Sequence, residues 1–184
     1  MGSIENLNRV RSYTILVIGP SKVGKTAIVR QFVDRKFTKG DETALDVPQR
    51  KQCWIDGEEC ELIIIDIPYK NTSTDSVSRN RLLDVYRDYI ADAQGYILCY
   101  ALDSLESFTL AWEFYRSIIF EKLFCPIVLV GNKNDKKNRA VNHIMALETT
   151  HSWRCPHFET CANCYMCVQE IFAEIVRRIK AQGE

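Results

Sequence analysis

The sequence has few glycines and prolines and no excess of charge of either sign. Its 184 residues include only eight glycines and five prolines, and 24 Lys and Arg side chains balance 24 Asp and Glu side chains. This composition excludes a collagen-like or low-complexity chain, and the zero net charge gives no support for broad attraction to nucleic acid or anionic membrane. With 46% hydrophobic residues, the chain can bury roughly 70% of the surface that its unfolded form exposes, so we expect one compact domain.

The sequence also lacks a long apolar run and a targeting signal. Its longest apolar stretches, around Ile63–Ile65, Tyr96–Leu102 and Pro126–Val130, are far shorter than the ~20 residues of a membrane-spanning helix. The N-terminal residues lack both a signal-peptide core and a myristoylation motif, and Lys180–Glu184 carry no prenylation box. We therefore expect a cytoplasmic monomer with no intrinsic membrane anchor and no nucleic-acid partner.

The chain contains eight cysteines. Without a secretory signal, they are predicted to be reduced thiols rather than a disulfide framework. Three of them form the pattern Cys161-x-x-Cys164-x-x-Cys167, with Cys155 and two histidines nearby, so a zinc site is one alternative. We favour the other, in which Cys164 and Cys167 enter the last helix facing different ways and all three are ordinary small side chains.

Strand-like and helix-like segments alternate along the whole chain. Strands are predicted at Tyr13–Gly19, Gln52–Ile55, Glu59–Asp66, Gly95–Leu102, Pro126–Gly131 and near His157–Thr160. Asp56-Gly57 lies between the second and third of these and is a strong hairpin signal. A mostly parallel, doubly wound sheet follows, and the ligands of such sheets bind beyond the carboxyl ends of the strands.

Helices are predicted between these strands from apolar residues at spacings of three and four. They cover Lys25–Arg35, the segment up to Ala93, the segment that Ser104 caps, a weaker stretch near Val141–Thr150, and the C-terminal segment. The residues expected to face the core are Leu82, Val85, Tyr86, Tyr89 and Ala93, then Leu105, Phe108, Trp112, Tyr115 and Ile119, and finally Val168, Ile171, Phe172, Ile175 and Ile179.

The loop after the first predicted strand carries a complete phosphate-binding pattern, G-x-x-x-x-G-K-[ST]. It reads Gly19-Pro20-Ser21-Lys22-Val23-Gly24-Lys25-Thr26 and lies between a strand and a helix, as the pattern requires. Its glycines let backbone N–H groups face phosphate oxygens, and the helix N-terminus adds partial positive charge. We assign this loop, with Ala27, to nucleotide binding. Lys25 is expected to act catalytically on the β- and γ-phosphates, and the Thr26 hydroxyl to coordinate Mg²⁺.

A second polar loop, Asn132-Lys133-Asn134-Asp135, directly follows the predicted strand Pro126–Gly131. The Asp135 carboxylate can accept hydrogen bonds from N1–H and the exocyclic amine of guanine, whereas adenine has no matching pair of donors. Asn132 is expected to brace the loop, and the stem of Lys133 to cover the base. Alone, N-K-x-D is a common polar turn, but downstream of a phosphate loop it predicts guanine-nucleotide binding.

Asp66 directly follows the apolar strand Leu62–Ile65. Burying a carboxylate at such a position costs free energy unless the carboxylate binds a partner. Beside a phosphate loop it can hold Mg²⁺ through a water molecule. The alternative is a solvated aspartate at a strand end.

Together these motifs resemble those of the Ras family of small GTPases, in the family's order and over about Tyr13 to Lys180. Thr160-Cys161-Ala162 and the hairpin around Asp56-Gly57 also match its pattern. The resemblance implies a single α/β domain of the Ras-like P-loop type, with a six-stranded, mostly parallel sheet, one antiparallel strand and about five helices. It divides the chain into an N-terminal extension (1–12), a GTPase domain (13–180) and a C-terminal tail (181–184).

The same resemblance implies the ligands, GTP or GDP with Mg²⁺, and further contacts to guanine. Phe37 falls where the family stacks an aromatic ring on the base, and Ala162 where a backbone N–H meets the guanine oxygen. Cys161-Ala162-Asn163 replaces the family's Ser-Ala-Lys, which is expected to weaken the guanine pocket modestly.

The chain departs from the family after Asp66, where Thr-Ala-Gly-Gln is replaced by Ile67-Pro68-Tyr69-Lys70. Tyr69 is less permissive than glycine, Pro68 lacks an N–H, and Lys70 cannot accept a hydrogen bond from the attacking water. Hydrolysis by the usual route is therefore expected to be very slow. Charge stabilisation by Lys70 is a weaker catalytic alternative.

The two switch segments of the family are also altered. Asn71–Asn80 resembles a polar insertion. The family's threonine ligand to Mg²⁺ aligns with Thr43 or with Ala44, depending on the loop length, and both alignments remain open. Asp46–Gln49 replaces the family's acidic effector pattern, so its usual effectors are not assumed.

Two functions from different classes follow from these residues. The first is a guanine-nucleotide switch that engages protein effectors or regulators through its switch regions, with impaired hydrolysis. The second is a pseudo-GTPase that serves as an interaction scaffold. A phosphate-loop kinase is disfavoured by the base-reading loop Asn132–Asp135.

Overall fold

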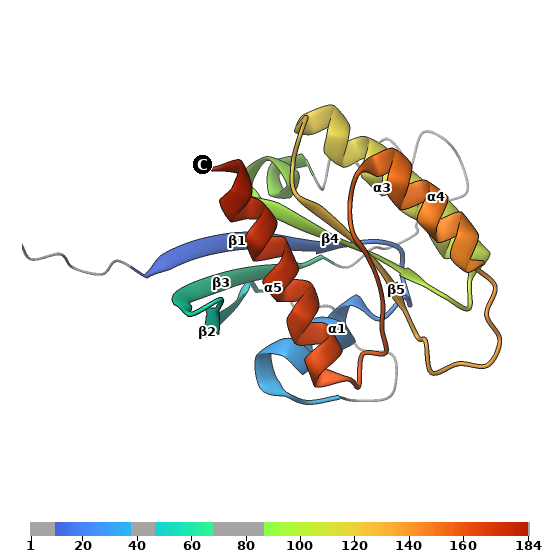
Figure 1. The fold of residues 1–184 in the computed structure, drawn as a ribbon, viewed down its shortest axis with the longest axis horizontal. Helices are drawn as coiled ribbons and strands as arrows, with labels where there is room; N and C mark the ends of the chain where they lie inside the picture. Colours follow the sequence, from blue (N-terminus) through green and yellow to red (C-terminus); the bar gives the residue numbers. More distant parts are fainter. Residues whose placement is uncertain (1–9, 38–46, 68–86, 184) are drawn as a thin grey trace, which may run out of the picture.

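The computed structural model describes residues 10–37, 47–67 and 87–183. Its centre is a six-stranded sheet in the order β2-β3-β1-β4-β5-β6 (Figure 1). The strands are β1 (Arg11–Ile18), β2 (Gln49–Ile55), β3 (Glu58–Asp66), β4 (Gly95–Ala101), β5 (Ile127–Asn132) and β6 (His157–Glu159). Only β2, paired with β3, runs antiparallel to its neighbour among these strands. The predicted α/β class and the single antiparallel strand are confirmed.

Helices cover both faces of the sheet. They are α1 (Lys25–Asp34), α3 (Leu105–Glu121), α4 (His143–Trp153) and α5 (Tyr165–Gln182), and residues 87–92 are also helical. One apolar core joins α1 and α5 to the sheet, and a second joins α3, α4 and the helical segment around Ile90 to the opposite face. Figure 1 shows α5 crossing in front of β1 and β3. No helix in the described part of the chain has the length and apolar character to cross a bilayer.

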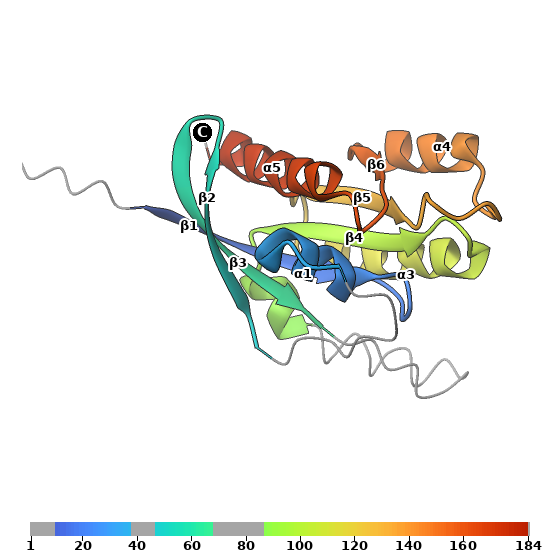
Figure 2. The same cartoon turned by 90° about the horizontal axis from the view of Figure 1, so that it is seen from below.

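The hairpin and the caps form where the sequence predicts them. Asp56 and Gly57 both have positive φ, +53° and +80°, as a two-residue hairpin turn requires. The turn places Ile55 opposite Glu58, and Figure 2 shows the β2–β3 hairpin at one edge of the sheet. At the start of α3, the Ser104 hydroxyl accepts a hydrogen bond from the backbone N–H of Ser107.

The apolar stripe predicted for α3 is confirmed at Phe108, which is buried, and at Tyr115 and Ile119, which pack against the same core, but it is wrong at two positions. Leu105 and Trp112, both expected in the core, are 47% and 40% exposed, whereas Phe114 and Ile118 are buried. Trp112 instead packs edge-on against Trp153 of α4, with ring centroids 4.9 Å apart. The prediction gave most weight to the largest apolar side chains. The sheet instead packs against a neighbouring face of the helix that includes Phe114 and Ile118. The rings of Trp112 and Tyr115 pack against Trp153, between α3 and α4.

The face predicted for the segment before β4 needs a similar correction. Tyr89 is 43% exposed, while Ile90 and Ala93 are buried. The other residues predicted for this face, Leu82, Val85 and Tyr86, lie outside the described residues. The stripe of α5 is confirmed, because Val168, Ile171, Phe172 and Ile175 are all fully buried and Ile179 packs against the same core.

The parallel strands place the loops that carry the sequence motifs at one edge of the sheet. The phosphate-type loop follows β1, Asp66 ends β3, and Asn132 ends β5. The register sets Val17 of β1 beside Asp66, and Ala101 of β4 beside Asn132. Because β6 also runs parallel to β5, the loop after Glu159 opens on the same edge.

Candidate functional site

At two positions of the loop between β1 and α1, neighbouring atoms of β4 and β5 lie too close to the backbone for any residue other than glycine. Gly19 has a φ of +145°, and a Cβ atom there would stand 2.2 Å from the carbonyl oxygen of Cys99. Gly24, the N-cap of α1, has a φ of +94°, and its Cβ would stand 2.3 Å from Nδ2 of Asn132. Glycine is therefore required at both ends of this loop, by β4 at one end and by the loop after β5 at the other.

The middle of the loop turns outward and leaves the start of α1 electropositive. Ser21 and Lys22 are exposed, with Lys22 at a φ of +63°, and Val23 is buried. Ala27 is half-buried in the first turn of α1, which contains no acidic residue. The partial positive charge of the helix N-terminus is thus not offset by a carboxylate within that turn, as suits the binding of an anion.

The side chain of Lys25 points back over the loop between β1 and α1, and its ammonium group contacts Pro20 near the start of that loop. Its side chain is only 7% exposed, and Nζ donates a hydrogen bond to the carbonyl oxygen of Pro20 at 2.9 Å. Burial lowers the pKa of Lys25, against the opposing effect of the Asp66 carboxylate. A bound phosphate would stabilise the charged form of this lysine far better than one carbonyl dipole does.

Thr26 and Asp66 meet beside this lysine. The Thr26 hydroxyl donates to Oδ2 of Asp66 at 2.5 Å, and both side chains are buried. A hydroxyl and a carboxylate are the hard oxygen donors that Mg²⁺ prefers, with waters and phosphate oxygens completing its shell. The pair therefore fits a magnesium ion bound next to a phosphate chain, as the sequence predicts.

Asn132 connects the two motif loops. It is 2% exposed, and its Nδ2 donates to the carbonyl oxygen of Val23 at 2.8 Å. The side chain of Asn132 thus braces the phosphate-type loop after β1, whereas the sequence predicted that it would brace its own loop.

Lys133 and Asp135 project from the turn that follows Asn132. Lys133 has a φ of +67°, which belongs to the left-handed region, and its carbonyl oxygen accepts a hydrogen bond from the N–H of Lys136 at 3.1 Å. The Asp135 carboxylate accepts a hydrogen bond from Sγ of Cys161 at 3.1 Å. Burial raises the pKa of the Cys161 thiol, and so does the neighbouring Asp135. Cys161 therefore remains a donor that orients the carboxylate.

The loop after β6 is fastened on both sides. The N–H of Asn134 donates to the carbonyl oxygen of Thr160 at 3.0 Å. On the other side, Nε2 of Gln31 in α1 donates to the carbonyl oxygen of Asn163 at 3.1 Å. Ala162, between these ties, is buried. The three segments predicted to surround a nucleotide are thus joined by hydrogen bonds.

Asp103, which follows β4, is a site residue that the sequence analysis missed. Its Oδ2 lies 2.6 Å from Nζ of Lys136, and its Oδ1 lies 3.7 Å from Nζ of Lys133. Burial acts to raise the pKa of Asp103, but the hydrogen bond from Lys136 and the charge of Lys133 outweigh it and leave the pKa below its usual value. The signal in the sequence was an acidic residue just beyond the buried strand Gly95–Ala101.

The remaining predicted site residues are one exposed aromatic side chain and several positions that lie outside the described residues. Phe37, three residues after α1, is 44% exposed. Thr43 and Ala44, the alternative switch ligands, lie outside the described residues. So do Pro68–Lys70 and the Asn71–Asn80 segment.

The prediction that all cysteines are reduced thiols is wrong for one pair. Cys164 and Cys167 form a disulfide, and the other six cysteines are free. Cys164 caps α5 and Cys167 lies three residues further, so the two share a helix face, contrary to the divergent orientation expected. Their Cα atoms are 5.4 Å apart, within the range of disulfides. Across the described residues, no cluster of three or more His, Cys, Asp or Glu side chains is placed to hold a metal ion, which leaves the zinc alternative without support.

Comparison with known families relates the chain to the Ras family. The sequence model of the Ras family matches residues 14–181, which include every motif loop described above.

Proposed function

The chain belongs to the Ras family, and from this premise we propose that it binds GTP and GDP with Mg²⁺ and acts as a signalling switch with very slow intrinsic hydrolysis. Family membership supports a small-GTPase-like, nucleotide-binding protein. The observation that carries the more specific proposal is the hydrogen bond from Asn132 to Val23, because it joins a phosphate-type loop to a base-type loop in one site.

The residues at the start of α1 would bind the phosphates. The ammonium of Lys25 would exchange the Pro20 carbonyl for phosphate oxygens, and the N–H groups after Gly19 would donate to the same chain. Mg²⁺, when bound, would neutralise part of the phosphate charge. Thr26 would hold it directly and Asp66 through water, and Thr43 is our candidate for a further ligand.

The loops after β5 and β6 would select guanine. Asp135 would accept hydrogen bonds from N1–H and the exocyclic amine, and the backbone N–H of Ala162 would donate to the guanine oxygen. Lys133 would cover one face of the base and Phe37 would stack on it. Replacing Asp135 with Asn is expected to shift the preference from guanine toward xanthine nucleotides, and unchanged selectivity would remove the assignment.

Slow hydrolysis follows from the residues after Ile67. Pro68 and Tyr69 stand where the family uses small residues beside the γ-phosphate, and Lys70 stands where a glutamine orients water. The test is to identify the nucleotide that co-purifies and then to follow single-turnover GTP cleavage with Mg²⁺. Bound guanine nucleotide with almost no phosphate release supports the proposal. Rapid release would contradict it and would favour a catalytic role for Lys70.

The same replacement of the hydrolytic residues favours a second candidate, a pseudo-GTPase that serves as a scaffold. Hydrogen exchange of residues 41–80 in the GTP and GDP states separates the two candidates. A switch should show different protection in the two states, and a scaffold little difference. As a switch, the protein would be a cytoplasmic monomer that meets effectors or regulators through these segments.

A further inference from the structure

The disulfide Cys164–Cys167 occupies the first turn of α5. Cys164 is the N-cap of this helix, and its Sγ accepts a hydrogen bond from the backbone N–H of Cys167 at 3.3 Å. Cys164 is half-buried and Cys167 is exposed, so at least one sulfur can be reached from solvent. The first turn of α5 contains no acidic residue.

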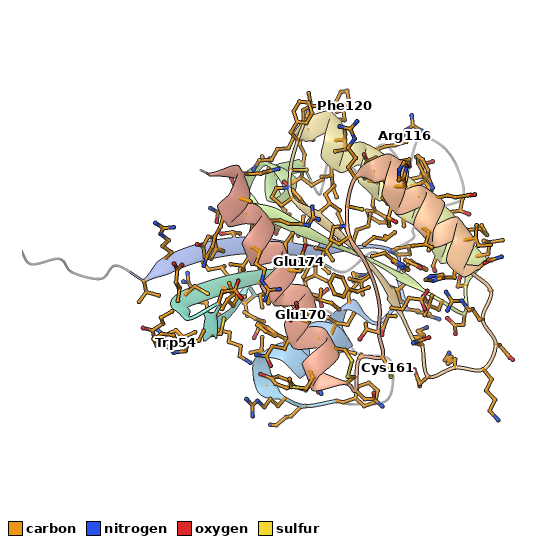
Figure 3. The ribbon with its side chains drawn as sticks, viewed as in Figure 1. Trp54, Arg116, Phe120, Cys161, Glu170 and Glu174 are labelled. Carbon is orange, nitrogen blue, oxygen red and sulfur yellow. A yellow bond between two sulfur atoms is a disulfide. The ribbon has the colours of Figure 1, made fainter. Side chains whose placement is uncertain are left out.

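This disulfide is directly connected to the loop that would read the base. The backbone N–H of Cys164 donates to the carbonyl oxygen of Cys161 at 2.8 Å, and the Cys161 thiol donates to Asp135 at 3.1 Å. Figure 3 shows Cys161 at the end of the molecule where α5 begins. Two hydrogen bonds, both through Cys161, therefore connect Cys164 of the sulfur pair to the carboxylate of Asp135.

Cys164 caps α5, so its sulfur lies at the positive end of the helix dipole. A helix N-terminus stabilises a negative charge on the sulfur that caps it. A stabilised thiolate is a good leaving group, which makes its disulfide easy to reduce.

A second pair of cysteines, Cys53 and Cys60, is close in space but is not suited to thiol–disulfide exchange. Cys53 and Cys60 face each other across β2 and β3, with their Sγ atoms 3.8 Å apart and unbonded. Burial raises the pKa of the Cys53 thiol to about 12. A thiol whose pKa is raised in this way is a poor nucleophile and a poor leaving group, so this second pair is not a competing site of thiol–disulfide exchange.

We propose that Cys164 and Cys167 form a redox-active disulfide, and that its reduction by a dithiol loosens the base-reading loop and speeds guanine-nucleotide release. A Cys-x-x-Cys disulfide in a reducing compartment is typically transient and catalytic or redox-sensing rather than structural. The effect on nucleotide rests on the function proposed above, and the reducing compartment rests on the cytoplasmic location proposed there, whereas the exposure and helix-capping position of the pair do not.

The reduction is a two-electron thiol–disulfide exchange. A thiolate of the dithiol attacks the exposed sulfur of Cys167, forms a mixed disulfide, and releases Cys164 as a thiolate. The second thiolate of the reductant then attacks its own partner sulfur and releases Cys167. The reductant leaves as a disulfide, and its two protons are shared between the cysteines and solvent. Reoxidation by a disulfide of the same class reverses both steps.

Reduction removes the covalent link between the N-cap and the first turn of α5. The hydrogen bonds that hold Cys161 and Asn163 then act on a less constrained turn. Because affinity changes within one site appear mainly in the dissociation rate, we expect release of GDP to be about threefold to tenfold faster from the reduced protein.

The redox half is tested on the full chain by alkylation and mass spectrometry after equilibration in oxidised or reduced dithiothreitol. Cys164 and Cys167 should be protected from alkylation in the oxidised buffer and modified in the reduced buffer. Equal modification in both buffers would overturn the proposal. This readout is independent of nucleotide, so it still decides the redox assignment if the protein binds no guanine nucleotide.

The coupling half is tested by releasing fluorescent N-methylanthraniloyl-GDP from the same two samples. The Cys164→Ser/Cys167→Ser variant should release at the fast rate in both buffers. Cys125→Ser, which changes a half-buried cysteine just before β5, should keep the redox response of the wild-type protein. Equal release rates from the oxidised and reduced wild-type protein would overturn the coupling. Hydrogen exchange of residues 133–136 and 160–164 in nucleotide-free protein gives a second readout, and identical exchange in both states would also overturn it.

Discussion

The side-chain amide of Asn132 donates to the carbonyl oxygen of Val23 over 2.8 Å and so ties the end of β5 to the loop after β1. The two residues are 109 positions apart in the sequence. Gly24 leaves the space for this contact, since a Cβ atom there would stand 2.3 Å from the same amide nitrogen. One buried side chain thus joins the loop after β1 to the end of β5, the two segments proposed to bind the phosphates and the base.

Replacing Asn132 with Ala should weaken both halves together. The Val23 carbonyl would lose its partner inside the protein, which typically costs 1–3 kcal/mol, or about tenfold in affinity. We expect GDP and GTP to dissociate about tenfold faster, as measured with fluorescent analogues. Asn138→Ala, which changes an exposed asparagine in the following loop, is the matched control and should leave the rates unchanged. Wild-type rates in the Asn132 variant would show that the tie does not support binding.

Replacing Asp103 with Asn should loosen the base-reading turn selectively. The substitution removes the charge that holds Lys133 and Lys136 while keeping the size of the side chain. We expect guanine-nucleotide affinity to fall about threefold to tenfold, with Asp103→Glu recovering part of the loss. Calorimetric titration with GDP measures the effect. Asp88→Asn, at an exposed position before β4, provides the control, and an equal loss in both variants would mean a general charge effect.

Candidate site residues could be recognised in the sequence where the chemistry requires one residue type at one position. They could not be recognised where many residue types would fit and only the fold brings their partners together. Gly19, Lys25 and Thr26 form a pattern whose chemistry requires those residues in that order, and Asp56-Gly57 requires a turn. Asp103 escaped prediction because an aspartate after a strand is common, and its partners are brought to it only by the parallel alignment of β4 and β5.

The core residues of α3 were harder to predict for a different reason. Leu105, Trp112 and Phe114 are all large and apolar, so helical spacing alone admits two adjacent stripes. The choice between them depends on α4, whose Trp153 packs against Trp112. The Cys164–Cys167 disulfide was missed because the expected compartment argued for thiols throughout, whereas pairing depends on the local geometry of a helix N-terminus.

Replacing Gly19 with Ala should destabilise the protein more than the same change at Gly57. Both glycines have positive φ, +145° and +80°, so both variants carry backbone strain of about 1 kcal/mol or more. Only at Gly19 does the new Cβ also meet backbone, 2.2 Å from the Cys99 carbonyl oxygen, whereas Gly57 has nothing within 4 Å. Urea unfolding without nucleotide should show a loss at least about 1 kcal/mol larger at Gly19. Equal losses would indicate that β4 can move away.

Glu159 should make the stability of the protein depend on acid pH. It accepts hydrogen bonds from Arg139 and His143, and chiefly the Arg139 guanidinium lowers the pKa of Glu159 from its usual 4.5 to about 2, against the effect of burial. A carboxyl group whose pKa is lower in the folded protein stabilises it above the unfolded pKa, and this contribution disappears as pH falls through the folded pKa.

The measurable consequence is a pH-dependent difference between two proteins. Glu159→Gln should lower the free energy of unfolding by about 1–2 kcal/mol at pH 7, and this difference should shrink between about pH 4.5 and pH 2. Thermal or urea unfolding across this range measures it. Glu148→Gln, on the exposed side of α4, should follow the wild-type protein throughout. A difference that stays constant with pH would rule out the ionised pair as its cause.

The most direct test of the account is calorimetric titration of folded, nucleotide-free protein with GDP and with ADP in the presence of Mg²⁺. Because the loop after β1 is proposed to bind the phosphates and Asp135 to select guanine, GDP should bind with a clear heat of association and ADP should give little or none. No heat with GDP, in protein that circular dichroism shows to be folded, would contradict the account.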